Sequence, residues 1–406
     1  MKILLYATFP TQSNGYARIA NNIANYLSEY PDVDIYYFGI TGYDENLVRR
    51  YIHPRIRLMN VIQNSPSKDA YGVDLIVDAI NDIRPDIVMI YNDILVISRI
   101  LSKINTIDRT LIKFKVYTYI DLVYKFENTN IILSIDKSTD RFFVFSECWL
   151  KNMIDIGVSE SKIFVLKHCL DTKNIYRVDV NNARRILGIH EEDFIILNIN
   201  RNTHRKAIDI TVSSFLRFLK RQYCDPRIKL YLNSFKEQNS YDILEIIKVE
   251  CLLLKLDYEK IIYNHVLISA NPIMTDEIVN QLYNACDVGI NTCYGEGFGL
   301  CNLEHASVGK PQVMSMVGAL VDIFNDGHCK LIQPRTRIYI PPVMDKTGGY
   351  LEICHPDDFA DALEYYYLNK EQRLEDGEFY INKIIREYNW NDVIKEFYEN
   401  HIKIGS

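Results

Sequence analysis

The stretch CYGEGFGLCNLEHASVGKP, residues 293–311, follows an apolar, strand-like segment and holds two carboxylates eight positions apart. Glu296 lies in a turn between two glycines, which allow unusual backbone angles and the close approach of a ligand. Apolar residues at helical spacing predict a short helix that starts at Leu300 and stops near Gly309. Glu304 then lies one turn into this helix, near its apolar side, where a charge needs a partner. One glutamate in the turn and a second on the following helix indicate a ligand site.

The composition bounds the class of protein. The chain has 406 residues, 48% of them apolar, which favours two or three compact domains. A net charge of −7 argues against a partner nucleic acid. Nine cysteines without paired spacing predict buried thiols in a reducing compartment. No signal sequence or transmembrane run is recognisable, so we expect a cytoplasmic protein for which peripheral membrane contact stays open.

Apolar strand-like segments alternate with helix-like segments in both halves of the chain. The first series lies at residues 2–7, 33–39, 86–91, 114–119 and 141–146. The second series lies at residues 194–200, 228–234, 265–270, 287–291 and 311–316. This alternation predicts parallel sheets covered on both faces. We therefore predict an α/β protein with two Rossmann-like parallel-sheet domains facing a central cleft, and we place the border in the polar stretch 171–190.

Loops at the carboxyl ends of parallel strands are where such sheets bind ligands. The loops expected at this edge are 8–15, 200–206 and 293–299. No G-x-G-x-x-G or P-loop pattern occurs in them, which argues against a dinucleotide oxidoreductase. Arg201 and Lys206 precede a helix whose N-terminus favours an anion, so we assign them to a diphosphate. We interpret His204 and Arg205 as parts of a solvated basic loop.

The two carboxylates of the opening stretch receive separate roles. A carboxylate can accept hydrogen bonds from two neighbouring hydroxyls, so Glu304 is the expected ribose ligand and Glu296 the partner of sugar hydroxyls. The alternative for both is a structural acid that caps a helix or pairs with Lys or Arg. A zinc site of Cys293, Cys301 and His305 fits no common ligand spacing, and we prefer two core thiols and a surface imidazole.

The stretch EGFGLCNLEHASVGKP, residues 296–311, resembles the signature of retaining family 4 glycosyltransferases of the GT-B fold (glycosyl transferases group 1). In that family two glutamates bracket a Phe-Gly turn and a Gly-x-Pro follows. NRNTHRKAID, residues 200–209, resembles the family's Arg-then-Lys diphosphate loop, with Ala207 where glycine is usual. SNGYARIANNIANYL, residues 13–27, resembles the glycine loop and first helix, which implies that Gly15 lies beside the donor phosphate.

The resemblance spans most of the chain and implies a domain plan. VLKHCLD, residues 165–171, resembles the interdomain segment, and YNWNDVIKEFY, residues 388–398, resembles the C-terminal segment that crosses back to the first domain. The implied parts are an acceptor-side domain at 1–175, a nucleotide-sugar donor domain at 188–385 and a crossing helix at 386–406.

The resemblance also implies the activity. It is the transfer of a sugar, with retention, from a GDP- or UDP-linked donor to a hydroxyl of a carbohydrate or glycolipid acceptor in glycan biosynthesis. No cofactor or metal is implied, because protein cations replace the ion, and Asp32-Val33-Asp34 opens a strand and is interpreted as a turn. The implied catalytic residues are Glu296, Arg201 and Lys206. The implied donor-binding residues are Gly15, Gly297, Phe298, Gly299, Leu300, Glu304 and Asp121.

One departure from the family concerns the donor sugar. In VYTYIDLVY, residues 116–124, the resemblance implies a histidine before Asp121 that contacts the hydroxymethyl group of the donor, but the chain has Ile120. An apolar side chain there predicts a 6-deoxyhexosyl donor such as fucose or rhamnose. If Asp121 or a water takes over the contact, the donor is an ordinary hexose.

Two other classes of function stay open at this point. The same fold would suit a nucleotide-sugar epimerase or a phosphorylase, which needs no acceptor or uses free phosphate. A non-catalytic two-lobed ligand-binding protein would bind without turnover.

Overall fold

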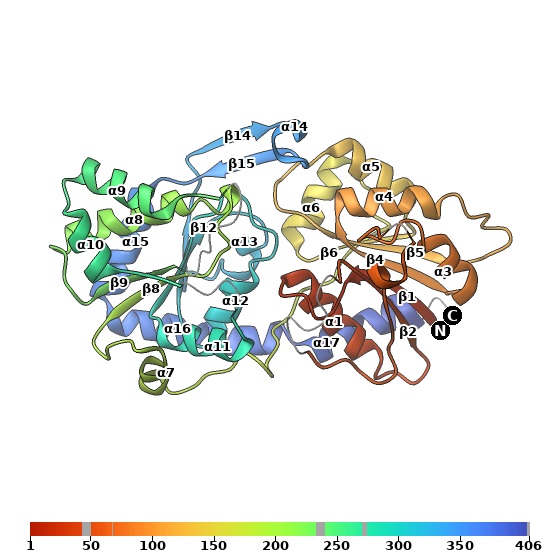
Figure 1. Ribbon diagram of the computed structural model, residues 1–406, viewed down its shortest axis with the longest axis horizontal. Helices are drawn as coiled ribbons and strands as arrows, with labels where there is room; N and C mark the ends of the chain where they lie inside the picture. Colours follow the sequence, from red (N-terminus) through yellow and green to blue (C-terminus); the bar gives the residue numbers. More distant parts are fainter. Residues whose placement is uncertain (43–49, 67, 233–239, 270–273, 404–406) are drawn as a thin grey trace. The chain divides into compact units, whose positions relative to one another are not determined.

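The computed structural model describes residues 1–42, 50–66, 68–232, 240–269 and 274–403 (Figure 1). The chain divides into two compact units. The N-terminal unit consists of Met1–Cys169, Ile340–Gly349 and Tyr388–Ser406, and the C-terminal unit consists of Leu170–Tyr339 and Tyr350–Glu387.

The N-terminal unit is built on a seven-stranded sheet with the order β3-β2-β1-β4-β5-β6-β7. Its strands are β1 (Lys2–Thr8), β2 (Asp34–Ile40), β3 (Arg57–Asn60), β4 (Ile87–Asp93), β5 (Lys115–Asp121), β6 (Arg141–Val144) and β7 (Ile163–Val165). All neighbours run parallel, with Ile3 opposite Ile35 on one side and Ile87 on the other. Six of the seven residues of β1 are buried, as expected for a strand covered on both faces.

The helices of this unit are α1 (Gly15–Leu27), α2 (Val61–Asn64), α3 (Ile76–Ile83), α4 (Ile94–Ile104), α5 (Thr129–Lys137), α6 (Glu147–Ile156), α14 (Pro342–Asp345) and α17 (Trp390–Phe397), which a π-helical turn at Tyr398–Ile402 extends. Helix α17 packs beside α1, where the rings of Tyr30 and Tyr398 stack at 3.8 Å between centroids (Figure 1). Asp32 accepts a hydrogen bond from the Tyr398 hydroxyl at 2.7 Å, so its carboxylate serves this packing.

The C-terminal unit is built on a six-stranded parallel sheet with the order β10-β9-β8-β11-β12-β13. Its strands are β8 (Phe194–Asn198), β9 (Ile228–Leu232), β10 (Val266–Ile268), β11 (Val288–Asn291), β12 (Gln312–Ser315) and β13 (Lys330–Ile332). Two further strands, β14 (Thr336–Ile340) and β15 (Gly349–Ile353), pair only with each other among the described residues.

The helices of this unit are α7 (Val180–Leu187), α8 (Ile208–Arg221), α9 (Ile243–Leu254), α10 (Tyr258–His265), α11 (Asp276–Ala285), α12 (Leu300–Ser307), α13 (Leu320–Ile323), α15 (Pro356–Leu368) and α16 (Lys370–Glu387). Helix α8 packs on α15, and α12 packs on α16. Gly377 permits the second contact, because a Cβ atom at this position would collide with the carbonyl oxygen of Gly309. Helix α12, which belongs to the glutamate stretch, is therefore packed closely against α16.

The predicted α/β fold class, with two Rossmann-like parallel-sheet domains, is confirmed. Each predicted strand segment contains a strand, although residues 233–234 and 270 of these segments lie outside the described residues. Strands β3, β7 and β13, with three or four residues each, are too short to show a period in the sequence. The polar stretch 171–190 contains α7, and residues 340–349 group with the N-terminal unit, although the sequence assigned them to the domain at 188–385.

The borders 1–175, 188–385 and 386–406 remain our proposal for the domains. Within the described residues, no helix combines the length and apolar character that crossing a membrane requires.

Candidate functional site

The carboxyl ends of β8 and β11 bring a carboxylate and two cations together in the C-terminal unit. Glu296 lies in the loop between β11 and α12, and Lys206 ends a 3-10 turn just before α8. The Lys206 ammonium donates to Oε2 of Glu296, and the two side chains are only 10% and 8% exposed. Nη1 of Arg205 lies 3.6 Å from Oε1 of Glu296 and donates to the carbonyl oxygen of Gly295 at 2.7 Å. The two sequence regions are therefore joined by a buried ion pair.

Glu296 is ionised in this surrounding. Burial alone raises its pKa, but the charges of Lys206 and Arg205, with hydrogen bonds from Lys206 and Asn291, lower the pKa to about 2. The pairing with Lys or Arg that the sequence left as an alternative is thus present. The interpretation of Arg205 as a solvated side chain was wrong, because the side chain is only 20% exposed and its guanidinium faces Glu296.

A chain of hydrogen-bonded, buried side-chain amides, which we did not predict from the sequence, contacts Glu296. Asn291, which ends β11, is 0% exposed and donates through Nδ2 to Glu296 Oε2 at 3.2 Å and to Asn302 Oδ1 at 2.8 Å. Its Oδ1 accepts from Asn200 Nδ2 at 3.2 Å, and Asn302 Nδ2 donates to Gln312 Oε1 at 3.0 Å. The available signal was an asparagine at the end of each apolar run, FIILNIN and DVGIN.

The glycine turn after Glu296 is packed rather than loose. Gly299 adopts a φ of +84°, and a Cβ atom there would lie 2.5 Å from Leu320 Cδ2. The amide of Ala319 donates to the carbonyl oxygen of Gly297 at 3.0 Å. Phe298 is buried, and Leu300, the first residue of α12, is half-buried. This packing holds the main chain on both sides of the turn.

Glu304 is buried one turn into α12 and accepts a hydrogen bond from the Tyr283 hydroxyl at 2.9 Å. His305 is also buried and stacks on Tyr283 with ring centroids 5.3 Å apart, and burial lowers the pKa of His305 to about 3. The prediction of a surface imidazole was therefore wrong. Cys293 is buried, whereas Cys301 is half-buried with Sγ 3.6 Å from Asn200 Oδ1.

Arg201 and His204 lie on the exposed side of the same loop. The carbonyl oxygen of Arg201 accepts from the amide of Thr203 at 2.9 Å, which turns the chain toward Lys206. The His204 ring lies 6.1 Å from the ring of Tyr241 and 5.5 Å from that of Tyr294. The Arg201 side chain is thus available to a ligand from solvent.

The N-terminal unit holds the remaining predicted residues. Gly15 is the exposed first residue of α1, whose cap is formed by the Asn14 side chain. Asp121 ends β5 and accepts a hydrogen bond from the Tyr16 hydroxyl. Burial is the main cause of the raised pKa of Tyr16, and the charge of Asp121 adds to it. Ile120 is 0% exposed. Its side chain therefore belongs to the core of this unit.

The N-terminal unit also holds a buried carboxylate that was not found from the sequence. Glu127 accepts from the amides of Val123 at 2.7 Å and Tyr124 at 3.0 Å. Burial raises its pKa to about 8, although these hydrogen bonds oppose the shift; Asp121 and Asp93 add to the rise. Glu127 therefore holds the loop after β5 through these two hydrogen bonds.

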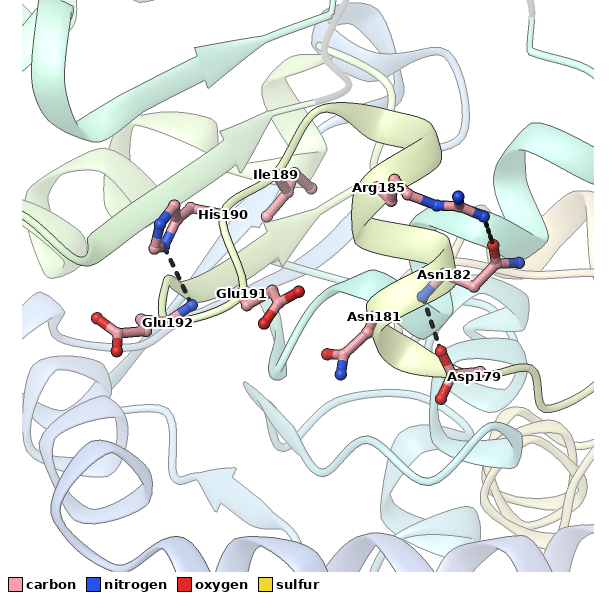
Figure 2. A pocket seen from close by; sticks show the side chains of 8 residues that line it. All are labelled: Asp179, Asn181, Asn182, Arg185, Ile189, His190, Glu191 and Glu192. Carbon is pink, nitrogen blue, oxygen red and sulfur yellow. Dashed lines mark hydrogen bonds between the residues drawn. The ribbon is translucent and has the colours of Figure 1, made fainter.

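A separate hollow of about 600 Å³ lies beside α7 in the C-terminal unit (Figure 2). Its lining residues are Asp179, Asn181, Asn182, Arg185, Ile189, His190, Glu191 and Glu192. Several of its polar groups bond to one another: Asp179 accepts from the amide of Asn182, and Arg185 donates to the Asn182 side chain at 2.8 Å. None of the residues assigned from the sequence lines it.

Residues 194–367 match the family described as glycosyl transferases group 1. An uncharacterized glycosyltransferase, MJ1607, of Methanocaldococcus jannaschii is 25% identical over 157 residues, which are 37% of this chain and 36% of the relative. The D-inositol 3-phosphate glycosyltransferase of Paenarthrobacter aurescens is 29% identical over 26% of this chain and 21% of the relative, and that of Kribbella flavida is 26% identical over 51% and 43%. The chain therefore matches less than half the length of each relative.

Solved structures resemble the whole chain. Sucrose-phosphate synthase from Thermosynechococcus elongatus superposes with a TM-score of 0.73 at 15% identity, covering 99% of this chain and 98% of that one. HepE of Anabaena in complex with UDP and glucose gives 0.70 at 14% identity and 98% coverage of both chains. The fold of this chain is thus GT-B. Residues 194–367, which match the family of glycosyl transferases group 1, carry both Glu296 and Lys206.

Proposed function

We propose that this protein is a retaining glycosyltransferase that moves a sugar from a nucleoside-diphosphate sugar to a hydroxyl of a carbohydrate or glycolipid acceptor. The observation that carries the proposal is the buried contact of Glu296 with Lys206 and Arg205, inside the region that matches the family. A diphosphate gathers negative charge as its bond to the sugar breaks, and cations fixed in advance stabilise that charge.

Each assigned residue has a role in this proposal. Arg201, Lys206 and the N-terminus of α8 bind the diphosphate, and we add Arg205 to this group because it faces the same carboxylate. Glu296 orients the sugar hydroxyls, and Glu304 accepts from the ribose. Donor contacts through the main chain come from the packed turn at 297–300 and, in the N-terminal unit, from Gly15.

Retention in our proposal comes from front-face attack assisted by the departing phosphate. Glu296 is held by Lys206, Arg205 and Asn291 through both carboxylate oxygens, which suits an orienting role better than a covalent one. The cations of the loop 200–206 replace a divalent ion, so we propose that the reaction needs no metal.

We propose an ordinary hexose on UDP or GDP as the donor. Among proteins of similar structure, HepE of Anabaena has been solved with UDP-glucose, and another, from E. coli, has been solved with UDP-2-fluoro glucose bound. A side chain with no exposed surface contacts a sugar only after it has moved, so the buried Ile120 favours the hexose over the 6-deoxyhexose. Asp121, which is partly exposed, is the remaining candidate at this position.

The test is a panel of nucleotide sugars incubated with the purified protein, with released nucleotide as the measurement. Acceptor-dependent release of UDP or GDP supports transfer. Conversion of the donor alone indicates an epimerase, and a requirement for free phosphate indicates a phosphorylase. Tight binding without turnover of any donor and acceptor pair would instead indicate a binding protein.

A further inference from the structure

Glu296 has three polar partners of two different kinds. Lys206 and Arg205 are cations, whereas Asn291 is neutral. All of them belong to the C-terminal unit, so their contacts are set within one compact body.

We expect the cations and the amide to respond differently to a bound donor. One carboxylate neutralises only one of the two positive charges, and a diphosphate brings additional negative charge to the same group. A lysine ammonium is a point charge on a flexible stem, so it can turn from Glu296 to a diphosphate oxygen. Glu296 then loses its strongest partner at the moment when it must orient the sugar.

Asn291 cannot turn from Glu296 to the diphosphate. It carries no charge, has no exposed surface and is bonded on both sides of its amide, to Asn302 at 2.8 Å and to Asn200 at 3.2 Å. The Asn302 side chain donates in turn to Gln312 at 3.0 Å, and the main-chain N–H of Asn200 donates to Asn198 Oδ1 at 3.0 Å. The end of β11 and the first turn of α12 thus hold the Asn291 amide in a fixed direction.

We propose that Asn291 is a positioning residue, which keeps the Glu296 carboxylate directed at the donor sugar once the diphosphate has drawn Lys206 away. This inference rests on the proposed function, and it adds a further residue to the same site.

The first test is Asn291→Ala, with steady-state kinetics and calorimetric titration of UDP and GDP alone. We expect kcat to fall about tenfold to a hundredfold, because the sugar loses a correctly directed partner, and the dissociation constant of the nucleotide to change less than about twofold. An unchanged kcat overturns the proposal. Equal losses of kcat and nucleotide affinity overturn it as well, since they indicate a general distortion of the loop.

Two further variants keep the test decisive if Asn291→Ala does not fold. Asn302→Ala removes a partner of Asn291 without touching Glu296, so it should lower kcat in the same direction by a smaller factor. Asn291→Asp is nearly the same size but replaces the donating amide by a second carboxyl group beside Glu296, so it should lower kcat at least as much as Asn291→Ala. An unchanged kcat in both of these variants contradicts the proposal.

The proposed function and the positioning role of Asn291 fail separately. If the wild-type protein neither binds UDP or GDP nor releases nucleotide from any donor, the proposed function is wrong. If the wild-type protein is active and Asn291→Ala has the same kinetic constants as the wild type, only the positioning role is wrong.

Discussion

Replacing Glu296 by Gln separates the charge of this residue from its shape. The amide keeps the size of the side chain but leaves Lys206, whose side chain is 10% exposed, without its carboxylate partner. Removing one partner of a buried ion pair costs about 3–5 kcal/mol. Because Arg205 is 20% exposed and can turn to water, we expect the low end, about 3 kcal/mol.

This loss should appear in the thermal unfolding of the C-terminal unit. For a domain of its size, 1 kcal/mol shifts the midpoint by roughly 2–4 °C, so about 3 kcal/mol predicts a decrease of roughly 6–12 °C. A nucleoside diphosphate supplies the missing anion, so UDP or GDP should raise the midpoint more in Glu296→Gln than in the wild type. Turnover should fall on the order of a hundredfold, because the sugar loses its charged partner.

The assay is differential scanning calorimetry with and without UDP or GDP. Glu304→Gln is the matched control, since its carboxylate accepts from the Tyr283 hydroxyl rather than from a cation. This variant should lose only about 1 kcal/mol, and UDP or GDP should raise its midpoint less than that of the wild type, because the ribose loses its proposed partner. A wild-type midpoint for Glu296→Gln, or equal nucleotide shifts in all three proteins, would refute the assignment of Glu296 as the counter-ion of this loop.

The other predictions concern the diphosphate, the metal, the pH dependence and the sugar. Arg201→Ala and Lys206→Ala should each lower turnover on the order of a hundredfold, measured as released nucleotide, and full activity in both would remove them from the mechanism. Activity should persist in excess EDTA, whereas loss in EDTA with rescue by Mn²⁺ would contradict metal independence. Burial raises the pKa of Glu127 to about 8, above its unfolded value, so the wild type should lose unfolding free energy between about pH 5 and 8. Glu127→Gln should lack this loss when the unfolding free energy is measured by denaturant titration at each pH. If the unfolding free energies of the two proteins change in parallel with pH, Glu127 does not cause the loss. UDP-glucose or GDP-mannose should be turned over faster than any 6-deoxy donor, and the reverse order would restore a specificity role for Ile120.

The sequence by itself determined the architecture, and it placed two charged loops at the carboxyl ends of strands. Apolar runs such as KILLYA and FIILNIN predict buried parallel strands, because only a strand covered on both faces needs continuous apolar residues. The stretches at 200–206 and 293–299 follow such runs, so their place at the carboxyl ends of strands follows from local pattern alone. These are short-range properties, and one sequence is enough to show them.

The tertiary structure decided which groups of these loops touch. Lys206 and Glu296 are 90 positions apart, as are Arg205 and Gly295, and no periodicity within one element shows that these pairs meet. The same holds for Asn200 and Asn291, which are 91 positions apart. Arg205 looked like a solvated cation, and Asn291 like the end of a strand, because burial and partners depend on the neighbouring strand. That neighbour is chosen by the packing of the whole sheet, in which β8 lies beside β11 although β9 and β10 come between them in sequence.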